Sequence, residues 1–187
     1  MEQCLETLDL AVAHGKALVT ASTGFSPEQF ERFEAAGRHI PIIFKCNTSK
    51  MVNVMLKLVE IAARALVDET DIEIIDQHDR DKLDAPSGTA LMIADAINTE
   101  ANGKYEYVYD RTQVRQKRGA QELGISSIRG GGIVGEHDVL FCGPDEVVTL
   151  SHSAGSRGVF ADGAVQAALY IAALGPRLLH DDRPAAR

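Results

Sequence analysis

A short segment of the chain gathers side chains that can hold an anion and move a proton. From His78 to Ala90 it reads His-Asp-Arg-Asp-Lys-Leu-Asp-Ala-Pro-Ser-Gly-Thr-Ala. His78 can carry a proton near neutral pH, and Lys82 supplies a mobile positive charge with three donors. A lone histidine or a charged loop is more often structural than functional, so it is the combination that predicts a site.

A helix is expected to begin inside this segment. Pro86 disfavours helical geometry at Ala85, and Ser87 has a side chain suited to an N-cap. The backbone amides of Gly88 and Thr89 then point outward from the first turn, where the partial positive charge of the helix attracts anions. Proton transfer from a placed side chain typically accelerates a reaction about 10²–10⁴-fold. The segment therefore predicts a pocket that grips a carboxylate and protonates what it holds.

The same segment closely resembles the signature of the 4-hydroxy-tetrahydrodipicolinate reductase (dihydrodipicolinate reductase) family of lysine and diaminopimelate biosynthesis. The resemblance extends over nearly the whole chain. It is carried by further motifs: Thr20-Ala-Ser-Thr-Gly-Phe25, Asn47-Thr-Ser-Lys-Met-Val-Asn-Val-Met55, Ser127-Ile-Arg-Gly-Gly-Gly-Ile-Val-Gly-Glu-His137, and Ser156-Arg157 with Phe160-Ala161 and Gly163-Ala164.

The resemblance implies a reaction and the residues that perform it. The family reduces an α,β-unsaturated cyclic imine dicarboxylate with NADPH or NADH: hydride reaches the ring, and the resulting enamine is protonated. His78 is then the proton donor and Lys82 the second catalytic residue, while the substrate is bound by Asp79, Ser87, Gly88 and Thr89. The residues implied at the cofactor are Ala21, Ser22, Thr23, Lys45, Cys46, Asn47 and Thr48. The resemblance implies no metal ion, and it implies a homotetramer built by the sheet of the second domain.

One departure from the family pattern concerns the start of the sequence. The family begins with a strand, a Gly-x-Gly-x-x-Gly turn and a helix that bind the pyrophosphate, whereas this sequence is expected to begin later, in a helix over residues 2–14. A literal Gly-x-Gly-x-x-Gly does occur over Gly130–Gly135. The nucleotide fingerprint needs a strand before it and a helix after it. Here strands are expected on both sides, which predicts a hairpin or bulge.

Three substitutions lie at the implied site. Asp79 stands where the family has a second His, and a carboxylate there would repel a dicarboxylate unless Arg80 or Lys82 neutralises it. Thr48 stands where an aromatic residue is common and Lys45 where a small residue is common. The nicotinamide pocket is therefore expected to differ from that of the family.

The composition is that of an ordinary soluble protein, with 45% hydrophobic and 25% charged residues among 187. That length suits one domain, or one domain and a fragment. The formal net charge of −8 argues against nucleic acid as a partner. We expect no membrane span, because no run of 18 apolar residues occurs, and no signal peptide. The three scattered cysteines fit a reducing cytoplasm better than a disulfide scaffold or a zinc site.

Hydrophobic periodicity predicts an α/β remnant of a doubly wound (Rossmann-like) domain over 1–48, followed by an α+β substrate and oligomerisation domain with a mixed sheet over 49–174. The last helix of that second domain is expected to be able to pack back on the first, and 175–187 is expected to be a tail. The expected helices cover 2–14, 49–66 and 158–173, with two more beginning at Ser26-Pro27 and at Ser87. The expected strands cover 16–20, 40–44, 71–76, 105–109, 123–129, 133–141 and 147–154.

Three functions remain open from the sequence. The first is the reductase. The second is a cofactor-independent enzyme that uses His78 and Lys82 for proton transfer on a cyclic imine or amino acid. The third is a non-catalytic relative that binds the dicarboxylate or serves as a scaffold, and Asp79 is the residue that favours it.

Overall fold

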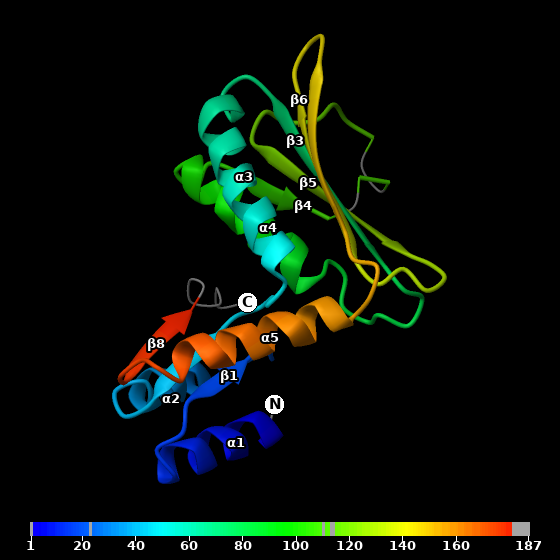
Figure 1. The fold of residues 1–187 in the computed structure, drawn as a ribbon. Coiled ribbons are helices and arrows are strands. Elements are labelled where there is room, and N and C mark those ends of the chain that lie inside the picture. The colour runs from blue at the N-terminus through cyan, green and yellow to red at the C-terminus, as the bar shows by residue number, and fades with distance from the viewer. Residues whose placement is uncertain (1, 23, 110, 113–114, 181–187) are drawn as a thin grey trace. The chain divides into compact units, whose positions relative to one another are not determined.

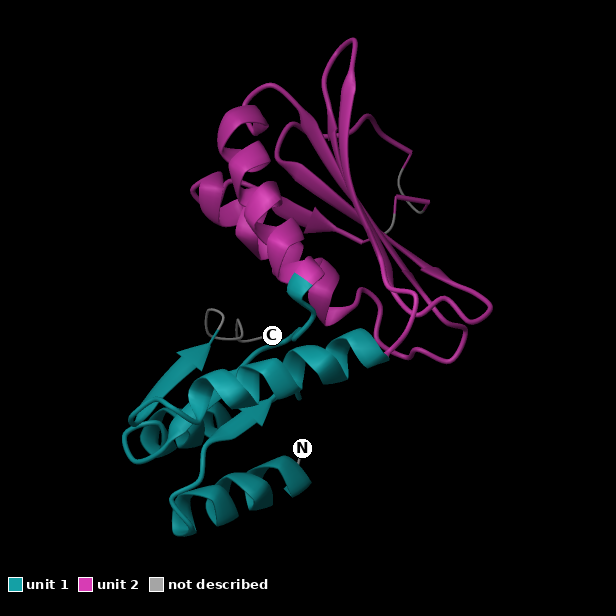
Figure 2. Ribbon diagram, in the orientation of Figure 1, with its two compact units in different colours: residues 1–50, 158–187 teal, residues 51–157 magenta. Residues whose placement is uncertain are grey.

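The computed structural model describes residues 2–22, 24–109, 111–112 and 115–180. The chain forms two compact units, drawn in different colours in Figure 2. Unit 1 comprises residues 1–50 and 158–187, and unit 2 comprises residues 51–157. The segment after residue 157 thus belongs to the first unit; the sequence analysis placed it in the second domain up to residue 174 and allowed its last helix to pack back on the first.

Unit 1 is built on a parallel three-stranded sheet in the order β1-β2-β8. The strands are β1 (Leu18–Thr20), β2 (Pro41–Phe44) and β8 (Arg177–His180). Its helices are α1 (Glu2–Ala13), α2 (Pro27–Ala36) and α5 (Gly158–Ile171). Helix α5 contacts β1 and β2, while α1 and α2 contribute to the core that covers the sheet. This is the α/β part that the sequence predicted.

Local sequence explains where α2 begins and what it packs against. Ser26 caps the helix in a reciprocal capping box with Gln29, the arrangement in which two backbone N–H groups at the helix start find side-chain partners. Phe33 then meets Phe44 of β2 edge to face at a centroid distance of 5.0 Å. Such aromatic pairs add to the free energy of burial, so α2 is anchored to the sheet at its centre.

The expected tail from residue 175 differs from the structure at strand β8. Leu178 and Leu179 lie in register with Ile42 and Ile43 of β2. Leu178 also packs against the core of unit 1. Pairing with the edge of β2 and burial of Leu178 give this short apolar run a reason to be ordered. Residues 181–187 of the expected tail lie outside the described residues.

Unit 2 contains a five-stranded mixed sheet in the order β4-β5-β3-β6-β7. The strands are β3 (Asp71–His78), β4 (Glu106–Val108), β5 (Glu122–Arg129), β6 (Glu136–Cys142) and β7 (Val147–Ser153). The central strand β3 is parallel to β5 and antiparallel to β6. Helices α3 (Lys50–Leu66) and α4 (Gly88–Glu100) cover one face of this sheet (Figure 1). The mixed sheet confirms the predicted fold class.

The core of unit 2 depends on strict alternation along β3. Ile72 and Ile74 are fully buried and pack with α3 and α4. Because successive side chains of a strand point to opposite faces, Asp76 continues the same row and is also fully buried. A carboxylate therefore lies on the helix-covered face of the sheet.

The glycine-rich segment between β5 and β6 is not a hairpin, which corrects the sequence interpretation. Strand β3 lies between β5 and β6 and pairs with both. The connection over residues 130–135 must therefore cross the carboxyl end of β3, where His78 is the last residue. The backbone N–H of Gly130 donates to the carbonyl of His78 at 2.9 Å, which ties this crossing to the strand.

Among the described residues, none of the helices combines the length and the apolar character that crossing a bilayer requires.

Candidate active site

A row of polar side chains crosses the sheet of unit 2 near the carboxyl end of β3. Asp76 is in register with Ser127 on β5 and with His137 on β6. His137 is in turn in register with His152 on β7. Asp76 and His137 are buried, and a buried polar group is costly unless it is hydrogen-bonded. The contacts within this row therefore decide the geometry of the site.

One oxygen of the Asp76 carboxylate accepts hydrogen bonds from strand β5 and from the start of a helix. Oδ2 accepts from the backbone N–H of Ser87 at 2.9 Å and from Nη2 of Arg129 at 2.9 Å. It also accepts from the hydroxyl of Ser127 at 3.2 Å. The Arg129 guanidinium donates onward to the carbonyl of Asp84 at 2.7 Å. The loop between β3 and α4 is thereby tied to the buried carboxylate.

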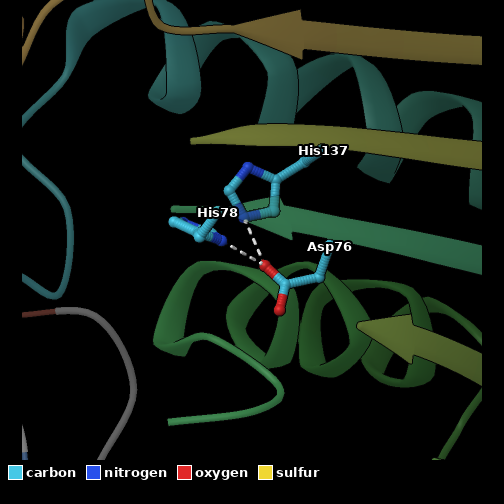
Figure 3. A group of neighbouring side chains, drawn as sticks. All are labelled: Asp76, His78 and His137. Carbon is cyan, nitrogen blue, oxygen red and sulfur yellow. Dashed lines mark ion pairs between the residues drawn. The ribbon is translucent and has the colours of Figure 1, made fainter. Parts of the chain in front are cut away.

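The other oxygen of Asp76 faces two imidazole rings. Oδ1 lies 2.9 Å from Nδ1 of His78 and 3.4 Å from Nε2 of His137 (Figure 3). Although burial works to raise the pKa of Asp76, the donors from His137, His78, Arg129 and the Ser87 backbone outweigh it and hold that pKa far below its usual range. Asp76 is therefore a carboxylate anion inside the protein.

The His78 ring is held on one side and kept clear on the other. Its side chain is only 12% exposed, and Nδ1 faces Asp76. A Cβ atom added at Gly135 would lie 3.1 Å from Nε2 of His78. Any larger residue at position 135 would press on that atom. The crossing segment thus leaves room beside the nitrogen that points away from the carboxylate.

The start of α4 is fastened to the same row, and the predicted N-cap is confirmed. Ser87 has extended backbone angles, and its hydroxyl accepts from the N–H of Ala90 at 3.2 Å. The same hydroxyl lies 3.1 Å from Nε2 of His137. Ser87 therefore places the first turn of α4, with Gly88 as its first residue and Thr89 buried behind it, next to the Asp76 carboxylate. The residues expected to grip an anion and the residue expected to move a proton are joined through one side chain.

Lys82 is held within its own loop. Its Nζ atom lies 2.7 Å from Oδ1 of Asp84, the residue whose carbonyl receives Arg129. The Lys82 side chain is 24% exposed. A contact between Lys82 and a bound molecule would therefore compete with Asp84 for the ammonium.

Asp79 is neutralised by a residue that the sequence did not suggest. Its Oδ2 pairs with Nη2 of Arg157 at 3.0 Å, rather than with Arg80 or Lys82. The backbone N–H of Asp81, and then Arg157, lower the pKa of Asp79 below its ordinary value. Asp79 therefore carries its negative charge beside a compensating cation.

The predicted cofactor residues follow two neighbouring parallel strands of unit 1. Ala21 and Ser22 follow β1, and 45–48 follow β2. The N–H of Lys45 donates to the carbonyl of Thr20 at 3.0 Å, which joins the two loops. Thr48 donates to the carbonyl of Phe160 at 2.7 Å. The ends of parallel strands are where α/β sheets bind ligands. Thr23 lies outside the described residues.

The polar row has the composition of a metal site but also carries a competing cation. Asp76, His78 and His137 each offer a ligand atom, and these atoms lie within 4.8 Å of one another. Arg129 already places a positive charge 2.9 Å from the same carboxylate, and like charges at that range repel strongly in a buried place. We therefore interpret the group as a hydrogen-bonding network around a carboxylate.

Four residues of this network were not among the predicted site residues: Asp76, Ser127, Arg129 and His137. A signal for the first was present in the sequence. The alternation of Ile72 and Ile74 puts Asp76 on the buried face, and a buried carboxylate is almost always paired. The partners could not be read in the same way, because they depend on strand register across distant segments.

The Arg129–Asp76 pair generates a stability prediction. We expect Arg129→Met to lower the free energy of unfolding by about 3–5 kcal/mol, because the buried Asp76 carboxylate loses the cation that compensates its charge. Arg64→Met is the matched control, because Arg64 is 67% exposed in its pair with Glu100, and its effect on the free energy of unfolding should be much smaller. Urea unfolding near pH 7 measures both.

The pH dependence of that difference follows from the lowered pKa of Asp76. A carboxyl group with a depressed folded pKa contributes stability above its unfolded pKa, about 3.9, and loses it as the pH falls toward the folded value. The difference in the free energy of unfolding between wild type and Arg129→Met should therefore be full at neutral pH. It should narrow as acid protonates the Asp76 carboxyl of the variant, whose folded pKa is less depressed than that of the wild type. Equal losses of unfolding free energy in Arg129→Met and Arg64→Met would show that the buried ion pair contributes no more than the exposed one.

Comparisons with known proteins agree with this structure. The family model described as dihydrodipicolinate reductase, N-terminus, matches residues 1–48, and that described as dihydrodipicolinate reductase, C-terminus, matches residues 51–181. The 4-hydroxy-tetrahydrodipicolinate reductase of Caldanaerobacter subterraneus subsp. tengcongensis is 50% identical over 161 residues, which are 86% of this chain and 64% of the relative. That of Aromatoleum aromaticum is 43% identical over 173 residues, which are 91% of this chain and 63% of the relative.

A solved structure has the same fold. The dipicolinate-bound dihydrodipicolinate reductase from Paenisporosarcina sp. TG-14 superposes with a TM-score of 0.71 at 26% identity, covering 96% of this chain and 68% of that one. The chain thus spans less than two thirds of the length of the curated relatives that it matches. The sequence motifs, the two-part fold and both family models lead to one assignment: this chain belongs to the dihydrodipicolinate reductase family.

Proposed function

We propose that the protein reduces 4-hydroxy-tetrahydrodipicolinate (dihydrodipicolinate) to tetrahydrodipicolinate with NADPH or NADH, in lysine and diaminopimelate biosynthesis. The observation that carries the proposal is the Asp76 carboxylate, which touches both His78 and the N–H of Ser87. It joins a proton-bearing ring to the start of a helix. The dipicolinate bound by the structural relative supports a planar ring dicarboxylate as the ligand class.

Binding of the dicarboxylate would use the start of α4. The first turn of a helix presents N–H groups and a partial positive charge to an anion. Gly88 is the first residue of this helix and lets a ligand approach the backbone closely. Ser87 and Thr89 flank it. Lys82 would add a charge-assisted contact by exchanging its partner Asp84 for a carboxylate of the substrate.

Protonation would use His78. A bound reduced nicotinamide supplies hydride to the substrate ring. Nε2 of His78, which lies beside Gly135, would deliver a proton to the enamine of the bound substrate. The Asp76 carboxylate 2.9 Å from Nδ1 stabilises the protonated ring before transfer and keeps it oriented afterwards.

The nicotinamide would lie against the loops that follow β1 and β2. They contain Ala21, Ser22, Thr23, Lys45, Cys46, Asn47 and Thr48. The close approach of α5 fits this use, because a side chain at Gly163 would collide with the carbonyl of Thr48. A glycine at that point fixes the loop after β2 against a helix, which suits a surface that must keep its shape.

The reductase proposal is tested by following oxidation of NADPH and NADH by the purified protein in the presence of the cyclic imine dicarboxylate. We expect turnover in the wild type and a loss of about 10²-fold or more in Lys82→Ala. Lys57→Ala is the control, because Lys57 pairs with Glu60 on the exposed face of α3. Binding of pyridine-2,6-dicarboxylate by calorimetry, without any dinucleotide oxidation, would reject the reductase and favour a dicarboxylate-binding or proton-transfer protein.

The Asp79–Arg157 pair generates a second prediction. Arg157→Ala should weaken binding of pyridine-2,6-dicarboxylate roughly fivefold, because the negative charge of Asp79 is then left uncompensated beside a dianion. The double variant Asp79→Ala with Arg157→Ala should regain binding, because both charges are gone. If the double variant binds as weakly as Arg157→Ala, Arg157 grips the ligand itself and does not serve to neutralise Asp79.

Self-association is also part of the proposal. The sheet face opposite α3 and α4 exposes apolar residues, among them Ile128 and Val147, and β7 forms an edge of the sheet. Homotetramers built on this face would bury both features. Light scattering should give the mass of a tetramer, and Val147→Lys should reduce that mass. A monomer in the wild type would refute the proposed self-association.

We also propose a cytoplasmic location, which cell fractionation tests.

A further inference from the structure

We infer that Asp76 is a positioning residue: it fixes the neutral His78 ring with its hydrogen on Nδ1, which leaves Nε2 as the atom that exchanges a proton with the bound molecule. The kinetic consequence rests on the proposed function. The placement of the hydrogen does not, because it follows from contacts inside unit 2 alone.

The contact between the His78 ring and the Asp76 carboxylate decides where the ring carries its hydrogen. A neutral imidazole has one N–H and one lone pair. Nδ1 of His78 lies 2.9 Å from Oδ1 of Asp76, and an ionised carboxylate can only accept. A lone pair on Nδ1 would face a full negative charge in a buried place, where the repulsion is strong. The hydrogen therefore belongs on Nδ1.

Oδ1 is the oxygen of the Asp76 carboxylate that remains available to the two histidines. The other oxygen is already engaged by Ser87, Ser127 and Arg129. The N–H of His78 does not point straight at Oδ1, since Nδ1 makes no aligned hydrogen bond among the described residues. The attraction between charge and dipole, rather than an ideal hydrogen bond, thus holds the ring.

The imidazole ring of His137 faces the same carboxylate oxygen. Nε2 of His137 lies 3.4 Å from the same Oδ1 and 3.1 Å from the hydroxyl of Ser87. By the same reasoning its hydrogen belongs on Nε2. Its Nδ1 is then a bare acceptor, and this atom has no hydrogen-bond partner among the described residues. An orphaned buried acceptor is tolerated more often than an orphaned N–H, so both rings are arranged to face hydrogens toward one oxygen.

Nε2 is the nitrogen of the His78 ring that is turned away from the carboxylate. Nε2 lies beside Gly135, where an added Cβ would approach to 3.1 Å. Gly135 is itself fixed, because its carbonyl accepts from the N–H of Ala154 at 2.9 Å. Carboxylate and glycine thus define the two ends of the ring: one holds a hydrogen, and the other keeps space for proton transfer.

The test reads the hydrogen positions directly. Nitrogen-15 NMR of the histidine side chains distinguishes the two neutral forms by the shifts of Nδ1 and Nε2. At a pH where the ring is neutral, the wild type should show His78 with its hydrogen on Nδ1 and His137 with its hydrogen on Nε2. A wild-type His78 that carries its hydrogen on Nε2 overturns the inference, whatever any variant does.

Two variants and one control separate positioning from folding. Asp76→Asn can turn an amide donor toward Nδ1, so His78 should change to the Nε2–H form, and kcat should fall about 10²–10⁴-fold with little change in KM. Gly135→Ala keeps the carboxylate, so the hydrogen should stay on Nδ1 while kcat falls. Asp138→Asn removes a neighbouring carboxylate that pairs with Gln77, and it should leave the ring and kcat unchanged.

The outcomes are distinguishable from failure of the reductase proposal. A wild type with the expected hydrogen positions but no reductase turnover would support the positioning role and reject the activity. An Asp76→Asn protein that folds, keeps the Nδ1–H form and loses only stability would show that Asp76 is merely structural, and would overturn the inference. If Asp76→Asn does not fold, the wild-type shifts and Gly135→Ala still decide.

Discussion

The site depends on an ionised carboxylate that lies with no exposed surface between a sheet and its covering helices. Such a group is stable only if donors replace the water it has lost. For Asp76 those donors come from β5, from β6, from the end of its own strand and from the start of α4. Each of these elements is therefore held at a hydrogen-bond distance from one atom group, and their mutual geometry follows from that constraint.

The topology of unit 2 explains why this point became the site. Strand β3 is central, with a parallel neighbour on one side and an antiparallel neighbour on the other. The connection over residues 130–135 must then pass across the end of β3, and Gly135 lets its backbone lie close to the ring of His78. The loop between β3 and α4 is tied to β5, because the guanidinium of Arg129 donates a hydrogen bond to the carbonyl of Asp84. A strand end, a crossing segment and a helix start meet around one ring.

Much of this could be predicted from the sequence, and the rest failed for physical reasons. Local signals were sufficient for the Ser26 and Ser87 caps, because a cap is decided within a few residues. Hydrophobic alternation gave the strands and hence the mixed sheet. The partner of Asp79 could not be predicted, since Arg157 is 78 residues away in the chain. The same limit hid the Asp76 network and made the glycine segment look like a hairpin, because strand order is set by tertiary packing.

The central claim is that Asp76 stays ionised inside the fold, and carbon-13 NMR of its carboxyl carbon tests this most directly. The donors around the group hold its pKa far below the ordinary range. Between about pH 7 and pH 3 the shift should therefore remain that of a carboxylate, as long as the protein is folded. A titration of this carbon near pH 4, like that of an exposed aspartate, would contradict the account.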